Sequence, residues 1–175
     1  MLDTESHNGV TVRPRREEDL NEAARILVTV HEADGYPVEG VDRPEQWLNA
    51  PGMISAWVAE LDGHIVGHVA VGSATTEEVQ GILHEQRKPV DNPAFLMRLF
   101  VSPATRRRSI GERLVATAVD FAEAQGLSLI LDVMAKDEAA IRLYERLGWR
   151  QIGESSHSFG DDEAVPAFWY LAPER

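Results

Sequence analysis

The chain has 175 residues, of which 43% are hydrophobic and 26% charged, and its net charge is −12. This length suits one domain with a sizeable core, and the composition is ordinary for a soluble globular protein. The absence of cysteine excludes disulfides, thiolate metal sites and a cysteine nucleophile. The negative charge disfavours nucleic acid as a partner.

Neither a membrane span nor a signal peptide is expected. No apolar run approaches the roughly 18 residues that a bilayer requires, and the first ten residues, MLDTESHNGV, are polar and acidic. We therefore expect a cytoplasmic protein with no membrane partner. A disordered lead is predicted over residues 1–9, followed by a single domain over residues 10–175.

The start of this domain predicts a strand followed by a helix. Residues 10–15 (VTVRPR) alternate like a short strand. Residues 16–34 have acidic side chains in the first turn, where the helix dipole favours them, and apolar residues at helical spacing. Gly35 ends this helix, and a second, short helix is expected near residues 45–49.

A β-hairpin is predicted over residues 54–74. Asp62-Gly63 is a strong two-residue turn signal between two alternating runs. The segment 75–93 is polar, with a helical turn expected around residues 77–86. We interpret this segment as an insertion over one face of a sheet.

The second half of the chain alternates strands and helices. The expected elements are a strand over 94–101, a helix over 109–126, a strand over 127–135, a helix over 137–148, and closing strands within 149–156 and 167–172. Because strand–helix–strand crossovers are right-handed, the first two of these strands should be parallel neighbours. The pattern predicts an α/β (α+β) domain, a mixed sheet with helices on both faces.

Residues 99–115, LFVSPATRRRSIGERLV, place three arginines between a strand and a helix. A helix N-terminus presents unpaired N–H groups and partial positive charge, so such a turn can bind phosphate. The alternative is a solvated basic loop that only precedes the helix. The chain has neither the Gly-Lys-Ser/Thr of a Walker A loop nor a Gly-x-Gly-x-x-Gly fingerprint.

This stretch resembles motif A of the GNAT-type N-acetyltransferase superfamily. The matching residues are Leu99, Val101, Pro103, Arg106 and Gly111, while Ser109 stands where the first glycine is usual. The segment DEAAIRLYERLGW resembles motif B of the same superfamily, with Asp137 in place of the usual Asn and Trp149 in place of Phe. Its matching positions are Asp137, Ala140, Tyr144, Gly148 and Trp149.

The resemblance implies a GNAT fold, a six- to seven-stranded mixed sheet whose central parallel strands splay apart to bind acetyl-coenzyme A. Backbone groups of Leu99, Phe100 and Val101 would pair with the pantetheine arm. The pyrophosphate would lie against the backbone amides of Arg107, Arg108, Ser109, Ile110, Gly111 and Glu112 and the side chains of Arg106, Arg107 and Arg108. Asp137 is grouped with these cofactor-binding residues.

Tyr144 occupies the position that, in this superfamily, protonates the departing thiolate. Because a thiol pKa of about 8.5 lies below a phenol pKa of about 10, the hydroxyl could instead stabilise the sulfur by a hydrogen bond. The alternative is a tyrosine packed in the core.

The attacking amine must be neutral, and deprotonating a lysine-like amine at pH 7 costs about 4.6 kcal/mol. Strand 94–101 has no glutamate, so His68 and Asp132 are the candidate bases. Side chains that could line an acceptor pocket are His31, Glu32, Asp34, Tyr36 and Trp57. For each of them an ordinary core or surface role is the alternative.

The sequence therefore predicts an N-acetyltransferase that moves an acetyl group from acetyl-coenzyme A directly to a primary amine of a small molecule or protein. Two alternatives stay open: transfer of a different acyl group, and a non-catalytic coenzyme A-binding module. No metal is expected, because the six histidines show no ligand spacing. A homodimer is compatible with the resemblance.

Overall fold

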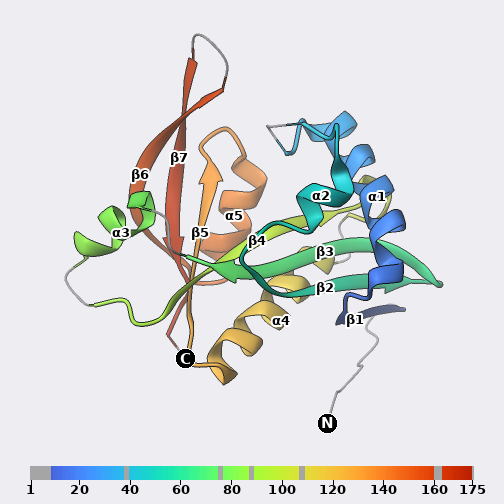
Figure 1. Ribbon diagram of the computed structural model, residues 1–175, viewed down its shortest axis with the longest axis horizontal. Coiled ribbons are helices and arrows are strands. Elements are labelled where there is room, and N and C mark those ends of the chain that lie inside the picture. The colour runs from blue at the N-terminus through green and yellow to red at the C-terminus, as the bar shows by residue number, and fades with distance from the viewer. Residues whose placement is uncertain are drawn as a thin grey trace. The chain divides into compact units, whose positions relative to one another are not determined.

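The computed structural model describes residues 9–37, 40–74, 77–86, 89–106, 109–159 and 163–174, and this part of the chain forms seven strands and five α-helices (Figure 1). The strands are β1 (Val10–Pro14), β2 (Met53–Leu61), β3 (His64–Ser73), β4 (Pro93–Val101), β5 (Ser128–Met134), β6 (Arg150–Phe159) and β7 (Glu163–Leu171). The helices are α1 (Leu20–Asp34), α2 (Pro44–Leu48), α3 (Glu77–His84), α4 (Ile110–Ala124) and α5 (Glu138–Arg146), with 3-10 turns at Glu17–Asp19 and Pro103–Thr105. Every predicted element is present, with ends shifted by a few residues.

The strands form one sheet in the order β1-β2-β3-β4-β5-β7-β6. The β4–β5 pair is parallel, with a register from Pro93–Ser128 to Phe95–Ile130 at the start of both strands. The outer pairs β1–β2, β2–β3, β5–β7 and β6–β7 are antiparallel. This confirms two predictions, that the sheet is mixed and that the strands now seen as β4 and β5 are parallel neighbours.

The predicted turns have the backbone conformations that their residues favour. Asp62 and Gly63 have φ of 51° and 80°, the left-handed pair that joins β2 to β3 in a two-residue hairpin. Gly35 ends α1 with φ of 73°, and its N–H donates to the carbonyl of His31. The lead predicted at residues 1–9 lies outside the described residues except for Gly9.

The chain falls into two units, Met1–Gly72 with Leu96–Ala118 and Ser73–Phe95 with Val119–Arg175. In the first unit, α1 and α2 pack on one face of β2–β4, where Leu27, Leu48 and Phe100 belong to one buried cluster. The opposite face is covered by α4, because Ile110 and Leu114 of this helix lie against Gly67 of β3. The single domain over 10–175 stays a prediction.

In the second unit, helices cover both faces of the strands β5, β7 and β6. Val79 of α3 is buried in a cluster with Ile130 and Trp169, so α3 is part of a core and not only an exposed insertion. The ring of Tyr170 lies 6.4 Å from that of Tyr144 on α5. Because Trp169 and Tyr170 are consecutive strand residues, α3 and α5 lie on opposite faces.

Candidate functional site

The turn between β4 and α4 has a backbone conformation that suits an anion. Ser109 has φ of 58°, and its carbonyl accepts from the amide of Arg113 at 3.1 Å, so it closes the first turn of α4. Ser109 carries a strain that glycine would avoid, which explains why glycine is usual at this position.

Gly67 fixes the start of α4 against the sheet. A Cβ atom at this position would lie 3.0 Å from Cδ1 of Leu114, 3.3 Å from Cγ2 of Ile110 and 3.3 Å from the carbonyl oxygen of Phe100. Ile110 and Leu114 are 2% and 0% exposed. The absence of a side chain at Gly67 therefore lets the first turn of α4 rest directly on β3 and β4.

Arg106 and Asp34, predicted separately for the cofactor and the acceptor cleft, form an ion pair. Nη2 of Arg106 donates to Oδ2 of Asp34 at the end of α1, and both side chains are about two-fifths exposed. The positive charge of Arg106 therefore lies beside the turn that leads into α4. Arg107 and Arg108 lie outside the described residues.

These features fit the phosphate-bearing part of acetyl-coenzyme A. The first turn of a 15-residue helix supplies amides and partial positive charge, and Arg106 supplies a full charge. Gly111 and Glu112 are half-buried in that turn. On β4, Leu99 and Val101 are half-buried while Phe100 packs into the core.

His68, a candidate base, is completely buried, and both of its ring nitrogens have partners. Nε2 lies 3.0 Å from Nη1 of Arg15, and Nδ1 lies 2.9 Å from the carbonyl oxygen of Arg98. Because a guanidinium can only donate, Nε2 is the acceptor and Nδ1 carries the proton. The ring also stacks on Phe100, with centroids 5.2 Å apart and planes 9° apart.

This environment keeps His68 neutral. Burial lowers the pKa of His68 to about 4, the hydrogen bond to Arg98 opposes that shift, and the charges of Arg15 and Arg98 add to it. A neutral imidazole whose lone pair already accepts from an arginine is a weak base at pH 7.

Arg98 lies at the centre of this region, and the sequence reasoning did not single it out. It has φ of 56° within the continuous strand β4, so the backbone departs locally from regular strand geometry there. Its Nε donates to the carbonyl of Trp47 at 2.9 Å, and its Cζ lies 4.1 Å from the centre of the Trp47 ring. The signal that could have found it is one arginine inside the apolar run AFLMRLFV.

The acceptor-pocket candidates Tyr36, Trp57 and His31 lie at different places in the first unit. The Tyr36 ring meets Trp47 edge-on at 5.8 Å. Trp57 is 7% exposed and pairs with Val69 across β2 and β3. His31 lies in the last turn of α1, and its Nδ1 is buried with no hydrogen-bond partner among the described residues. Through its edge-on contact, Tyr36 supports the Trp47 ring over which Arg98 lies.

In the second unit, Tyr144 lies on the inner side of α5. It is 5% exposed, and its ring lies 5.5 Å from that of Trp149. Asp137 is the N-cap of the helix, because its carboxylate accepts from the amide of Ala140 at 3.4 Å. Asp132, the other candidate base, is exposed on β5 opposite Trp169 of β7.

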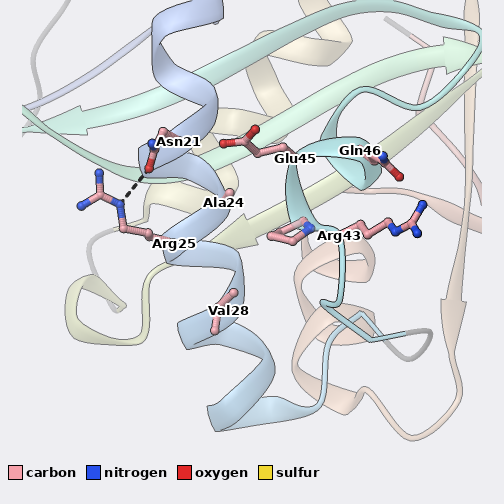
Figure 2. Close-up of a pocket in the computed structure, with 8 residues that line it drawn as sticks. Asn21, Ala24, Arg25, Val28, Arg43, Glu45 and Gln46 are labelled. Carbon is pink, nitrogen blue, oxygen red and sulfur yellow. Dashed lines mark hydrogen bonds between the residues drawn. The ribbon is translucent and has the colours of Figure 1, made fainter.

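A groove between α1 and α2 is apolar at its floor, where Ala24, Val28 and Pro44 lie. Figure 2 shows the guanidinium groups of Arg25 and Arg43 pointing to opposite sides of it. Arg25 is held by Asn21, whose Oδ1 accepts from its Nε at 3.1 Å. The charged side chains that line the groove do not point toward one common position. We therefore assign no catalytic or binding role to this groove.

Within the described residues, no group of three or more His, Asp or Glu side chains is placed to hold a metal ion. No helix in the described part of the chain is long and apolar enough to span a bilayer.

Residues 18–149 match the family model of the acetyltransferase (GNAT) family. The chain belongs to this family. The match includes the β4–α4 turn and α5 with Tyr144. It confirms the resemblance that the two motifs carried, and the fold predicted from them.

Among the relatives, the chain is 35% identical over 114 residues to N-acetylaspartate synthetase from Mus musculus, covering 65% of this chain and 33% of that protein. It is 36% identical over 104 residues to N-acetyltransferase family 8 member 3 from Rattus norvegicus, covering 59% of this chain and 41% of that protein. The chain therefore spans well under half the length of these curated relatives.

Solved structures share the fold at low identity. The complex of Arabidopsis thaliana NAA60 with acetyl-CoA has a TM-score of 0.68 at 20% identity, covering 93% of this chain and 98% of that one. The ribosomal-protein-S18-alanine N-acetyltransferase from Escherichia coli has a TM-score of 0.69 at 20% identity, covering 94% and 93%.

Proposed function

We propose that this protein is an N-acetyltransferase that moves an acetyl group from acetyl-coenzyme A directly to a primary amine. The observation that carries the proposal is the β4–α4 turn, in which left-handed Ser109 opens a 15-residue helix beside the cation of Arg106. Family membership and the named activities of the relatives support it.

For the cofactor, we assign the pyrophosphate to the first amides of α4, from Ser109 to Glu112. Helix N-terminal amides bind anions without a change in protonation. The side chain of Arg106 would exchange Asp34 for a phosphate oxygen, and Arg107 and Arg108 belong to the same assignment. The backbone of Leu99–Val101 would pair with the pantetheine arm.

Acetyl-coenzyme A supplies a thioester carbonyl: the N–C bond forms at this carbon, the C–S bond breaks, and one proton passes from the amine to the sulfur or to solvent. Tyr144 is proposed to donate its phenolic proton, or a hydrogen bond, to the departing sulfur. Its burial on α5 against Trp149 and Tyr170 would hold the hydroxyl in one orientation. Asp137 would act through this helix, by capping it.

For the base, we favour Asp132 over His68. Both ring nitrogens of His68 have partners and its pKa is lowered to about 4, so its proposed role is to position Arg15 and Arg98. Asp132 is exposed on β5 and can take up a proton directly or through water.

The acceptor is proposed to be a primary amine, and the names of the relatives indicate different amines for different proteins. Their names point to aspartate for one of them and to an alanine of a ribosomal protein for another. Tyr36, Trp57 and His31 are proposed to contribute to the acceptor pocket. A cytoplasmic location and a homodimer remain part of the proposal, and neither nucleic acid nor a membrane is a proposed partner of a chain with net charge −12.

The test is release of free thiol from acetyl-coenzyme A in the presence of a panel of amines. We expect thiol release that requires an amine and forms an equal amount of acetylated product. Propionyl- and succinyl-coenzyme A run in parallel test the alternative of another acyl group. Tight binding of coenzyme A with no thiol release from any donor would favour the non-catalytic module.

A further inference from the structure

Two guanidinium groups converge on the end of α2, on the face of β3 and β4 that α1 and α2 cover. Nη1 of Arg15 donates to the carbonyl of Leu48 at 2.9 Å, and Nε of Arg98 donates to the carbonyl of Trp47 at 2.9 Å. Trp47 and Leu48 are consecutive. Nε2 of His68 accepts from the guanidinium of Arg15, and Nδ1 of His68 donates to the backbone carbonyl of Arg98. The two cations therefore share one small region of the first unit.

Arg15 is half-buried, and its guanidinium is hydrogen-bonded to neutral groups within the described part of the chain. Besides Leu48 and His68, it donates to Oδ1 of Asn49 at 2.6 Å, and burial lowers its pKa. No carboxylate of the described residues lies within 4 Å of its guanidinium, because the nearby Asp19 is held by both Nη atoms of Arg13. Removing a cation from water without a counter-charge is costly.

Arg98 is held in a fixed orientation. Its Nε is fixed by the Trp47 carbonyl, its guanidinium lies over the Trp47 ring, and Tyr36 supports that ring from its edge. A planar guanidinium held in this way loses little entropy when it binds a carboxylate. Arg98 is also the residue directly before Leu99, where the proposed cofactor strand begins.

We infer that the acceptor amine carries a carboxylate and that Arg98 and Arg15 recognise it. Arg98 would contact the carboxylate directly, and the nearby positive charge of Arg15 would attract it. The inference rests on the proposed function, since it names the acceptor class of that same site. It accounts for two cations kept together in a chain of net charge −12. It also assigns His68 a positioning role: its neutral ring joins Arg15 to β4 without adding a third positive charge.

The test compares amines that differ only in the carboxylate. L-alanine, β-alanine and L-aspartate are each assayed against the corresponding carboxamide for thiol release from acetyl-coenzyme A. We expect the carboxylate form of at least one pair to have a kcat/KM about tenfold higher or more, the effect of one charged hydrogen bond. The amide is the less basic amine, so this preference would oppose intrinsic reactivity. Equal or better use of all the amides would overturn the inference.

Variants separate recognition from folding. Arg98→Met and Arg15→Met should raise KM for the preferred carboxylate about tenfold and raise KM for its amide much less, while Arg98→Lys should restore part of the loss. Arg16→Met is the matched control, because the Arg16 side chain is exposed and, among the described residues, its guanidinium pairs with Glu18 at 3.4 Å. The backbone bond of Arg16 to Asp19 is kept in this variant. Unchanged acetyl-coenzyme A affinity would establish that the variants are folded. An equal loss for acid and amide would contradict the inference.

A binding measurement keeps the two hypotheses distinguishable. If no amine supports thiol release, the proposed function fails, and titration of N-acetyl-L-alanine, N-acetyl-β-alanine and N-acetyl-L-aspartate against their amides, with coenzyme A present, still tests the anion site. Tighter binding of an acid that Arg98→Met abolishes would support the inference. Equal binding of acid and amide throughout would reject it.

Discussion

Nη1 of Arg15 lies 3.0 Å from Nε2 of His68, so the positively charged guanidinium donates a hydrogen bond to the lone pair of a buried imidazole. A second proton on His68 would bring two donors face to face and add a charge between Arg15 and Arg98. The stability of the first unit is therefore coupled to the protonation state of one histidine.

Stability should fall as the pH is lowered from about 6.5 to about 4. The pKa of His68 is lowered to about 4 in the folded protein, chiefly by burial, whereas in the unfolded chain it is about 6.5. Between these values the unfolded state binds more protons, so folding stability rises with pH across this window and is lost as pH falls through it. The shift is worth up to roughly 3 kcal/mol.

The measurement is denaturant unfolding at pH values from 7.5 to 4.5 for wild type and His68→Gln. Glutamine can accept from Arg15 but takes up no proton, so the variant should be less stable at pH 7.5 and have a flatter pH profile. The same slope in both proteins would mean that other groups, such as carboxylates, cause the acid sensitivity.

The ion pair between Arg106 and Asp34 should compete with cofactor binding. Arg106→Ala should weaken acetyl-coenzyme A binding about tenfold, or 1.4 kcal/mol. Asp34→Asn should strengthen it by about two- to fivefold, because an exposed pair of this kind is worth up to about 1 kcal/mol. Titration calorimetry on both variants and the double mutant gives the coupling. If Asp34→Asn has the same effect with and without Arg106, it acts only by removing negative charge.

Ser109→Gly should stabilise the protein by about 0.5–1 kcal/mol, because relief of the left-handed strain exceeds the entropy cost of glycine. Acetyl-coenzyme A affinity should change by less than about threefold if backbone amides make the contacts. Ser109→Val should be destabilising, since a β-branched residue tolerates positive φ poorly. Thermal unfolding with and without acetyl-coenzyme A measures both effects. Loss of binding in Ser109→Gly would instead assign the contact to the serine hydroxyl.

Gly67→Ala should destabilise the protein by about 1–3 kcal/mol, because the new Cβ would crowd Leu114 and Ile110. It should also weaken acetyl-coenzyme A binding by displacing the first turn of α4. Gly81→Ala in α3 is the control: open space surrounds its Cβ position, so stability should rise by about 0.5–1 kcal/mol. Normal cofactor binding in folded Gly67→Ala would separate the phosphate turn from its packing on β3.

The strand–turn–helix of the candidate site could be predicted because its signals are local. A buried strand, a proline, a run of arginines and a helical apolar pattern all lie within residues 94–124, and their register with the motif suggested a role for each. The left-handed backbone at Ser109 was indicated only by comparison with the glycine usual there.

The network around His68 could not be predicted in the same way. Arg15 and His68 are 53 residues apart in sequence, and their contact depends on how β1 and β3 align across β2. Nothing in the sequence near His68 indicates that both of its ring nitrogens have hydrogen-bond partners. For this reason the sequence left His68 as a candidate general base. The positive φ of Arg98 within β4 likewise could not be predicted, because strand propensity gives no signal of it.

Tyr144→Phe should lower turnover by about 10- to 100-fold while leaving acetyl-coenzyme A affinity nearly unchanged. The phenylalanine ring keeps the contacts with Trp149 and Tyr170, so the fold should persist. Only an interaction that strengthens as charge develops on sulfur is lost, and such a loss appears in kcat rather than in ground-state binding. General acid catalysis is typically worth about 10²–10⁴-fold, and the similar pKa values of thiol and phenol place the effect at the lower end.

The matched control is Tyr170→Phe, which removes another buried hydroxyl, the one that donates to Oε1 of Glu145 at 3.2 Å. Both variants are compared with wild type for turnover, cofactor affinity and thermal stability, using an amine from the acceptor screen. Tyr170→Phe should lose stability but keep turnover, since its hydroxyl is already engaged by Glu145. If folded Tyr144→Phe keeps full turnover, Tyr144 is a core residue and the proton for the leaving thiolate comes from solvent.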